Sequence, residues 1–322
     1  MKTIQNDIKN NSFKKIYLLY GEEGYLVNQF KKKLINAVAG DNSFNLTVVG
    51  EKPDWEEIGS VAETMPFMAE YRVIVFDRCN LFKNKDEKAV SFFERELPEY
   101  LIIIIAEESA DKRLTLFNLV KKKGYVCELG VQSQENVIKF ITGRCTDEGK
   151  CIDKDTTAEI YMRTLGDLGL VAGELEKLIA YTDGRSDICM EDVQKVCSTR
   201  VEARVFEMIE FIAYKKKQKA FALYFDLLAA REAPMKILIL LERHFYGLMQ
   251  VSASPGMPAG ELAKSMGVPP FVAGKYLKQV QGFTTERLKE LVNGFIQTEE
   301  DIKTGRMSDR TGCELMIAEA LS

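Results

Sequence analysis

Two glycines, Gly21 and Gly24, stand where a phosphate-binding loop would begin, between an apolar run over 16–20 and an amphipathic helical pattern. Such loops carry G-x-x-x-x-G-K-[ST], in which the lysine reaches the outer phosphates and the hydroxyl holds Mg²⁺. Counted from Gly21, the last three places hold Leu26, Val27 and Asn28. The loop also contains two acids that would repel phosphate oxygens, Glu22 and Glu23. The stretch indicates a nucleotide-binding element that no longer binds nucleotide; the alternative is an ordinary strand–turn–helix.

A second chemical signature concerns the acids that follow a buried strand. A nucleotide-hydrolysing protein of this layout would carry two acids after its third strand, for Mg²⁺ and for water activation. Here the strand over 72–76 ends in Asp77, and the next residue is the cation Arg78. Both signatures of ATP hydrolysis are therefore incomplete, and no catalytic residue is expected.

Composition narrows the remaining chemistry. The chain has seven scattered cysteines, no C-x-x-C and a single histidine, so neither a metal site nor His-dependent catalysis is expected, and no cofactor is assigned. A net charge of −4 with interspersed signs argues against a strong nucleic-acid surface. A polar N-terminus and the short apolar run over 100–106 predict a soluble, cytoplasmic protein without membrane contact.

The elements that would position these residues alternate over the first 150 positions. Strands are predicted at 16–20, 45–49, 72–76, 101–106 and 125–129. Helices are predicted at 25–38, 55–63, 88–94 and 114–123. Alternation of this kind predicts an α/β domain in which a parallel sheet is flanked by helices. The Gly21 turn would lie at the carboxyl end of a strand, where such folds bind ligands.

One connection in this region is unusually apolar. Met65, Pro66, Phe67 and Met68 follow the helix predicted over 55–63 and precede the strand at 72. Connections usually expose their side chains, and adjacent exposed Phe and Met often mark a contact surface. The alternative is that both side chains fold back into the core.

The rest of the chain reads as helical. A linker helix is predicted over 131–148 and a small all-helical segment over 154–196, with an apolar stripe along 168–179. From 205 onward the helices predicted are 205–214, 218–230, 234–252, 269–280, 284–303 and 309–321.

Eight segments of the chain together carry a family resemblance: 16–22, 63–68, 72–75, 110–113, 174–178, 267–271, 282–285 and 301–305. In their order and spacing the chain resembles the delta subunit of the bacterial DNA polymerase III clamp loader. The resemblance implies an AAA+-like first domain without ATPase motifs (1–142), a helical lid domain (143–204) and a helical collar domain (205–322). It also implies that Phe67 and Met68, flanked by Met65 and Pro66, grip the sliding clamp, although Met68 replaces the more familiar aromatic.

The function implied by the resemblance is mechanical. A non-catalytic subunit would bind and open the sliding clamp, the beta subunit, so that it can be loaded on primed DNA during replication. Its other partners would be the remaining subunits of a pentameric loader, within an assembly classed as a DNA-directed DNA polymerase, a nucleotidyltransferase (EC 2.7.7.7). DNA would be contacted through that assembly.

Two alternatives remain open at this point. One is a divergent P-loop NTPase that recruits its lysine from elsewhere. The other is a sister non-catalytic loader subunit, although those commonly carry a four-cysteine zinc module and a Ser-Arg-Cys motif, and neither is present here.

Overall fold

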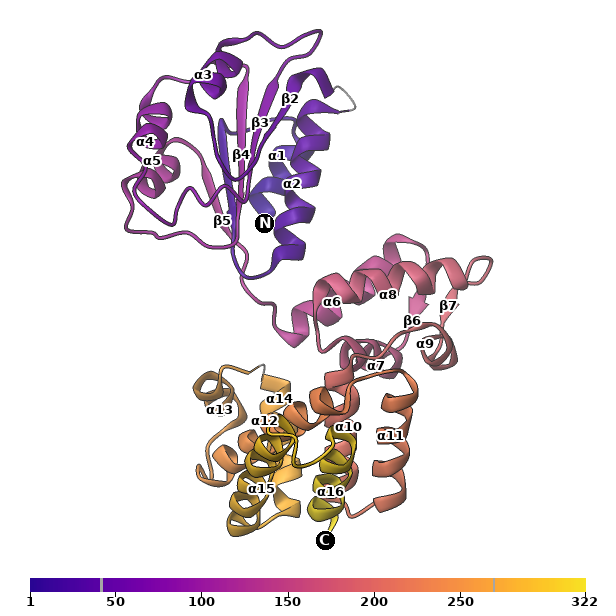
Figure 1. The fold of residues 1–322 in the computed structure, drawn as a ribbon. Coiled ribbons are helices and arrows are strands. Elements are labelled where there is room, and N and C mark those ends of the chain that lie inside the picture. The colour runs from indigo at the N-terminus through magenta and orange to yellow at the C-terminus, as the bar shows by residue number, and fades with distance from the viewer. Residues whose placement is uncertain (41–42, 269) are drawn as a thin grey trace. The chain divides into compact units, whose positions relative to one another are not determined.

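The computed structural model describes residues 1–40, 43–268 and 270–322 (Figure 1). The chain divides into two compact units, Met1–Gln132 and Ser133–Ser322. We call them unit 1 and unit 2 and describe each by itself.

Unit 1 is built on a five-stranded parallel sheet. Its strands are β1 (Ile16–Tyr20), β2 (Leu46–Val49), β3 (Arg72–Asp77), β4 (Leu101–Glu107) and β5 (Tyr125–Glu128), in the spatial order β2-β3-β4-β1-β5. Parallel neighbours need crossover connections, and helices supply them. β1 and β4 lie inside the sheet and are buried along their whole length, as their almost entirely apolar sequences predict.

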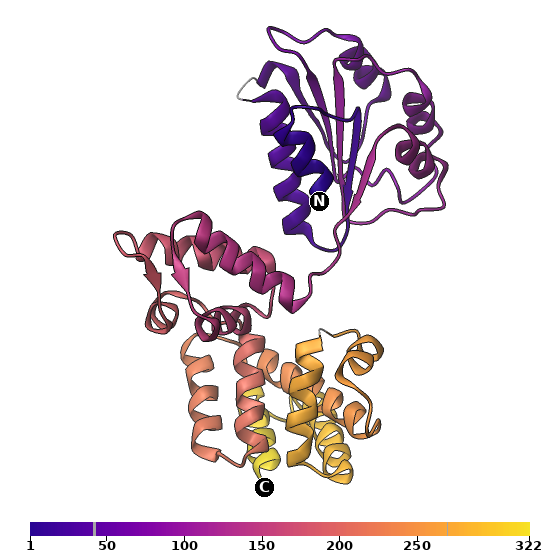
Figure 2. The ribbon, with the colours of Figure 1, turned by 180° about the vertical axis from the view of Figure 1, so that it is seen from behind.

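Helices cover both faces of this sheet (Figures 1 and 2). One face carries α1 (Lys2–Lys9) and α2 (Gly24–Ala39), and the other carries α3 (Trp55–Glu63), α4 (Glu87–Glu94) and α5 (Thr115–Lys123). A 3₁₀ turn, η1 (Ser43–Asn45), leads into β2. Alternate strand residues such as Ile16, Leu18 and Phe76 pack with the α3–α5 side, as the two-residue period of a strand requires. The predicted parallel sheet with flanking helices is confirmed.

The first part of unit 2 contains α6 (Gln134–Asp147), α7 (Lys154–Thr164), α8 (Leu168–Tyr181) and α9 (Met190–Val196). The all-helical prediction for this segment is wrong in one respect. β6 (Cys151–Ile152) and β7 (Asp187–Ile188) form a short parallel pair. Strands of two residues are too short to leave a periodic pattern in the sequence.

The second part of unit 2 is helical, as predicted. It consists of α10 (Val201–Ala213), α11 (Lys217–Ala229), α12 (Pro234–Ser252), α13 (Ala259–Met266), α14 (Pro270–Gln279), η2 (Val280–Gly282), α15 (Thr285–Lys303) and α16 (Asp309–Leu321). α13 was not predicted, and Pro269, the predicted start of α14, lies outside the described residues. A contact between the rings of Tyr161 on α7 and Phe271 on α14, 4.8 Å between centroids, joins the two parts.

Candidate functional site

The Gly21 turn lies between β1 and α2, and three of its backbone amides donate to carbonyl oxygens of the chain. The amide of Gly21 donates to the carbonyl of Glu107 at 3.4 Å, and the amide of Glu23 donates to Leu129 at 3.0 Å. The Gly24 amide donates to Glu22 at 3.1 Å. In a phosphate-binding loop, backbone amides of this kind point at the phosphates. Here these three donate to carbonyl oxygens instead, so the turn is closed by its own chain.

The residues at the three places of the Gly-Lys-Ser/Thr triplet bring neither a cation nor a hydroxyl to this turn. Leu26 and Val27 are buried in the core on α2, and Asn28 is half-buried beside them. The hollow that Gly21, Asn28 and Asp77 help to line measures only about 20 Å³. That volume admits about one water molecule. Of the two loop acids, Glu22 is exposed and Glu23 is half-buried at the N-cap of α2.

Asp77, at the end of β3, is held in an ion pair. The Nζ of Lys31 on α2 lies 2.6 Å from its carboxylate, and Lys31 is itself buried. An acid that coordinates Mg²⁺ has to present its oxygens to the ion. The contact with Lys31 instead ties α2 to the sheet, while Arg78 is exposed at the next position in a left-handed backbone conformation (φ 56°).

Glu107, at the end of β4, is a buried acid that the sequence analysis did not single out. Its carboxylate accepts from the backbone amides of Asn80 and Leu81, at 3.1 and 3.0 Å. Burial raises the pKa of this carboxyl, and the two amides act in the opposite direction. Glu107 thus fixes the connection from β3 to α4.

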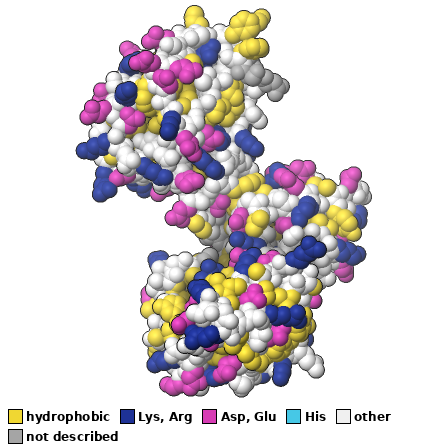
Figure 3. All heavy atoms as spheres, in the orientation of Figure 1, with side chains coloured by type: hydrophobic (Ala, Val, Ile, Leu, Met, Phe, Trp, Pro, Cys, Tyr) yellow, Lys and Arg dark blue, Asp and Glu magenta, His cyan; other side chains and the backbone are white. Residues whose placement is uncertain are grey.

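The α3–β3 connection presents its apolar side chains to solvent. Met65, Phe67 and Met68 are 75%, 60% and 88% exposed, and Pro66 is half-buried. The alternative that Phe67 and Met68 belong to the core is therefore excluded. Figure 3 shows hydrophobic side chains standing out at the upper edge of unit 1. Exposed large apolar side chains that cluster in this way mark interaction surfaces.

Three polar side chains, of which Arg72 and Asn45 are buried, hold the backbone of this connection. Arg72 donates from Nε to the carbonyl of Thr64 at 2.8 Å, and Tyr100 donates its hydroxyl to the carbonyl of Glu63 at 2.9 Å. Asn45 pairs with both backbone groups of Phe67: its Oδ1 accepts from the amide at 2.7 Å and its Nδ2 donates to the carbonyl at 2.8 Å. The backbone of the connection is braced while its apolar side chains stay in solvent.

Asn45 and Phe44 are site residues that sequence reasoning missed. Phe44 is 78% exposed, and its ring lies edge-on to Phe67 with 6.1 Å between centroids. The one sequence signal for Asn45 is its place directly before an apolar strand. The sequence does not show that its hydrogen-bond partner is Phe67, 22 residues further along the chain.

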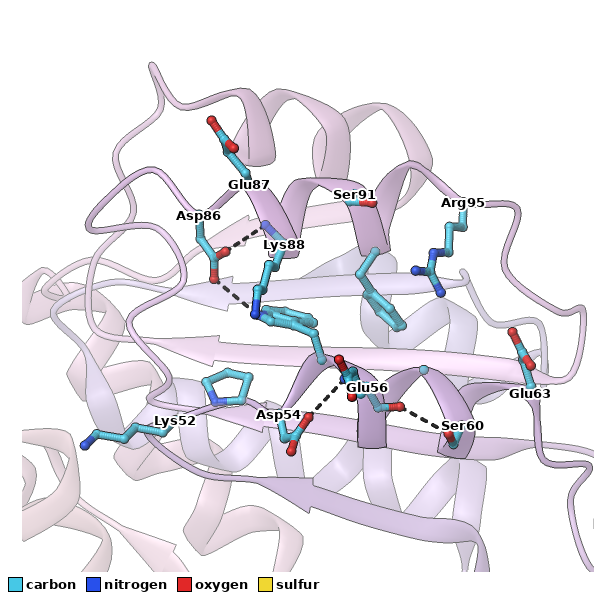
Figure 4. A pocket seen from close by; sticks show the side chains of 14 residues that line it. Lys52, Asp54, Glu56, Ser60, Glu63, Asp86, Glu87, Lys88, Ser91 and Arg95 are labelled. Carbon is cyan, nitrogen blue, oxygen red and sulfur yellow. Dashed lines mark hydrogen bonds between the residues drawn. The ribbon is translucent and has the colours of Figure 1, made fainter.

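An open groove of about 1240 Å³ lies between α3 and α4 in unit 1 (Figure 4). The indole N–H of Trp55 donates to Asp86 there, at 3.3 Å. The labelled charges have both signs, with Lys52, Lys88 and Arg95 among Glu56, Glu63 and Glu87. An open groove lined by charges of both signs does not indicate which kind of ligand would bind there.

Two other kinds of site are absent from the described residues. No group of three or more His, Cys, Asp or Glu side chains within 1–40, 43–268 and 270–322 could hold a metal ion. No helix in the same ranges is both long and apolar enough to cross a membrane.

The chain is similar over most of its length to proteins that are all described as delta subunits or delta proteins. A curated DNA polymerase III subunit delta from Bacillus subtilis (strain 168) is 25% identical over 333 residues, covering 99% of this chain and 96% of that protein. A probable DNA polymerase III subunit delta from Aquifex aeolicus (strain VF5) is 22% identical, covering 86% and 83%. The solved structure of the Bacillus subtilis DNA clamp loader delta protein shares the fold, with a TM-score of 0.73, 24% identity and 99% of each chain covered.

Family models match both ends of the chain. The model described as "DNA polymerase III, delta subunit" matches residues 17–129, which span the sheet, the closed turn and the α3–β3 connection. The model described as "DNA polymerase III delta subunit, C-terminal domain" matches residues 202–320, which span α10 to α16. The chain belongs to the family of DNA polymerase III delta subunits.

Proposed function

We propose that this chain is a non-catalytic clamp-loader subunit that binds the sliding clamp and favours its opened form, so that the clamp can be loaded on primed DNA. The observation that carries the proposal is the α3–β3 connection. Its backbone is braced by Asn45 and Arg72 while Phe67 and Met68 remain exposed. A preorganised apolar protrusion suits capture of a preformed apolar pocket, because little ordering entropy is lost on binding.

The division of labour along the chain belongs to the same proposal. The region 1–142 would contact the clamp, 143–204 would act as a lid, and 205–322 would join a collar with the other loader subunits in a pentamer. Residue 142 falls inside α6, so the first boundary is better placed at the unit boundary after Gln132. ATP bound by neighbouring subunits would govern whether the apolar connection reaches the clamp, a population shift without chemistry in this chain.

The test is a titration of the purified chain against the sliding clamp of the same organism. Burying one such side chain contributes roughly 1.5–3 kcal/mol, so Phe67 and Met68 together supply about 3–6 kcal/mol. Loss of half of that weakens binding by roughly one to two orders of magnitude. The double variant Phe67→Ala, Met68→Ala should lose clamp binding and keep its melting temperature, because both side chains are exposed.

Tyr181→Ala is the matched control, since Tyr181 is an aromatic residue of 52% exposure at the end of α8. It should bind the clamp as the wild type does. A double variant that binds at full affinity would contradict the assignment of Phe67 and Met68.

The alternative of a divergent NTPase is opposed by the closed Gly21 turn and the paired Asp77. Calorimetry of the isolated chain with Mg·ATP should show no tight binding and no turnover. Micromolar affinity with Mg²⁺-dependent hydrolysis, in a preparation free of other loader subunits, would favour the NTPase instead.

A further inference from the structure

The apolar surface of unit 1 has a component outside the α3–β3 connection. Phe44 lies in η1, before β2, and its ring meets the ring of Phe67 edge-on at 6.1 Å. Edge-to-face pairs at this separation attract one another. Phe44 is 78% exposed, so its ring supplies little to the core of unit 1. Two aromatic residues 23 positions apart in the sequence thus bring their rings together on the surface.

Asn45 links the two segments that carry these rings. It is fully buried and directly follows Phe44 in the chain. Its amide side chain pairs with the backbone N–H and the backbone C=O of Phe67 simultaneously, at 2.7 and 2.8 Å. A side-chain amide that uses its donor and its acceptor on one residue sets that residue's orientation as well as its position. Asn45 therefore couples the placement of Phe67 to that of Phe44.

The residue after Phe67 adds a second reason for such a brace. Met68 has a left-handed backbone conformation, with φ 50°. A non-glycine residue keeps this conformation only where its surroundings enforce it, because it is less favourable than the right-handed one. Without the Asn45 pairing, the connection would sample other conformations and the two rings would separate for part of the time.

We propose that Phe44 forms a composite contact surface with Phe67 and Met68, and that Asn45 is the positioning residue that presents this surface to an apolar cleft of the sliding clamp. The inference rests on the proposed function for the identity of the partner. We assign the clamp as the partner because Phe44 is continuous with the surface of Phe67 and Met68, which the proposed function assigns to clamp binding. The cleft has to be wide enough to accept two neighbouring rings.

The two roles predict different responses, which a pair of measurements on the full chain separates. One is clamp affinity. The other is hydrogen exchange of the Phe67 amide in the absence of clamp, which reports the Asn45 bond directly. Phe44→Ala should weaken clamp binding about tenfold and leave the exchange rate unchanged. Asn45→Ala should speed the exchange and also weaken binding about tenfold, because the competent conformation becomes a minor fraction.

Asn45→Ser guards against a variant that folds poorly. Serine is uncharged and keeps one polar group at this buried position, but its single hydroxyl cannot make both bonds to Phe67 with the geometry of an amide. Its exchange rate and its clamp affinity should lie between those of the wild type and those of Asn45→Ala. Tyr181→Ala should change neither measurement, and melting temperatures of all variants establish that they are folded.

Three outcomes would contradict the inference: one concerns the role of Phe44, one the role of Asn45 and one the identity of the partner. Wild-type affinity of Phe44→Ala would remove Phe44 from the contact surface. Faster exchange in Asn45→Ala with unchanged clamp affinity would make Asn45 a structural residue only. If the wild-type chain itself does not bind the clamp, the proposed function fails first, and the assigned partner fails with it.

Discussion

His244 shows what burial does to a single residue of this chain. It is the one histidine in the sequence and lies in the core of unit 2, on α12. Burial lowers the pKa of His244 to about 3, although the hydrogen bond to Gln279 (2.7 Å) favours the charged form. The rings of Phe206 and Tyr276 pack edge-on against it, at 4.4 and 4.5 Å. The neutral imidazole is therefore the folded form at neutral pH.

This placement predicts how stability responds to mild acid. The folded pKa is lowered below the ordinary value of 6.5, so the unfolded chain binds the proton first. The stabilising effect is complete above pH 6.5 and is lost as the pH falls from 6.5 towards 3. One proton corresponds to about 1.4 kcal/mol per pH unit in this window. Urea unfolding at pH 7, 6 and 5 should show this slope.

His244→Gln is the variant for comparison, because it keeps a polar group that can reach Gln279 without titrating. Its unfolding free energy should depend much less on pH between 7 and 5. An equal slope in the variant would mean that carboxyl groups, not His244, dominate acid sensitivity.

At the scale of elements, the turn between β1 and α2 is held by close backbone contact. Gly21 has φ 138°, a conformation that side chains rarely adopt. A Cβ at this position would lie 2.2 Å from the carbonyl oxygen of Leu129. Gly21 is required here because the backbone at Leu129 approaches it closely. In a nucleotide-binding loop a glycine is required because the phosphate approaches the backbone.

The neighbouring glycine provides a matched pair for a stability measurement. Gly21→Ala should destabilise the chain by more than about 2 kcal/mol, because neither backbone at the contact can move aside easily. At Gly24, the first residue of α2, a Cβ would meet nothing within 4 Å. Gly24→Ala should stabilise the chain by roughly 0.4–1 kcal/mol through the unfolded state. Thermal melting of both variants tests the pair, and similar melting temperatures would contradict it.

The elements also show what the sequence could and could not predict. The strands of unit 1 were predictable because runs such as Leu101–Glu107 are buried on both faces and contain little else than apolar residues. α1 was not predicted because its eight residues contain only two apolar side chains, Ile4 and Ile8, which is too few for a periodic pattern. The β6–β7 pair was missed because each strand has two residues.

For the candidate site, the sequence predicts which residue types are present but not the hydrogen bonds that hold them in place. The lysine, the hydroxyl and the second acid of a nucleotide site are all absent from positions fixed by the local sequence. The sequence alone therefore predicts that the nucleotide motif is incomplete. The hydrogen bonds from Asn45 to Phe67 and from Arg72 to Thr64 join residues that only the fold brings together. No local pattern distinguishes a buried asparagine that braces a loop from one that begins a turn.

At the scale of the whole molecule, the proposed function assigns clamp contact to one region of the chain and assembly with other loader subunits to another. The proposed collar boundary at 204/205 falls within α10, so a truncated chain should end at Arg200, before this helix. We expect such a chain to bind the clamp and to fail to join the other loader subunits. Size-exclusion chromatography of the mixture with those subunits is the measurement. Entry of the truncated chain into the complex would contradict the collar assignment.

The packing of Trp55 gives the two units separate optical signatures. It is the only tryptophan in the chain, and its ring packs against Phe76 and Phe92 in the core of unit 1, at 5.7 and 5.5 Å. Intrinsic fluorescence excited at the red edge of the indole band therefore reports on unit 1 alone, while far-ultraviolet circular dichroism is weighted towards the helices of unit 2. Coincident transitions by the two probes would mean that the units unfold together, and separate transitions would give each unit its own stability.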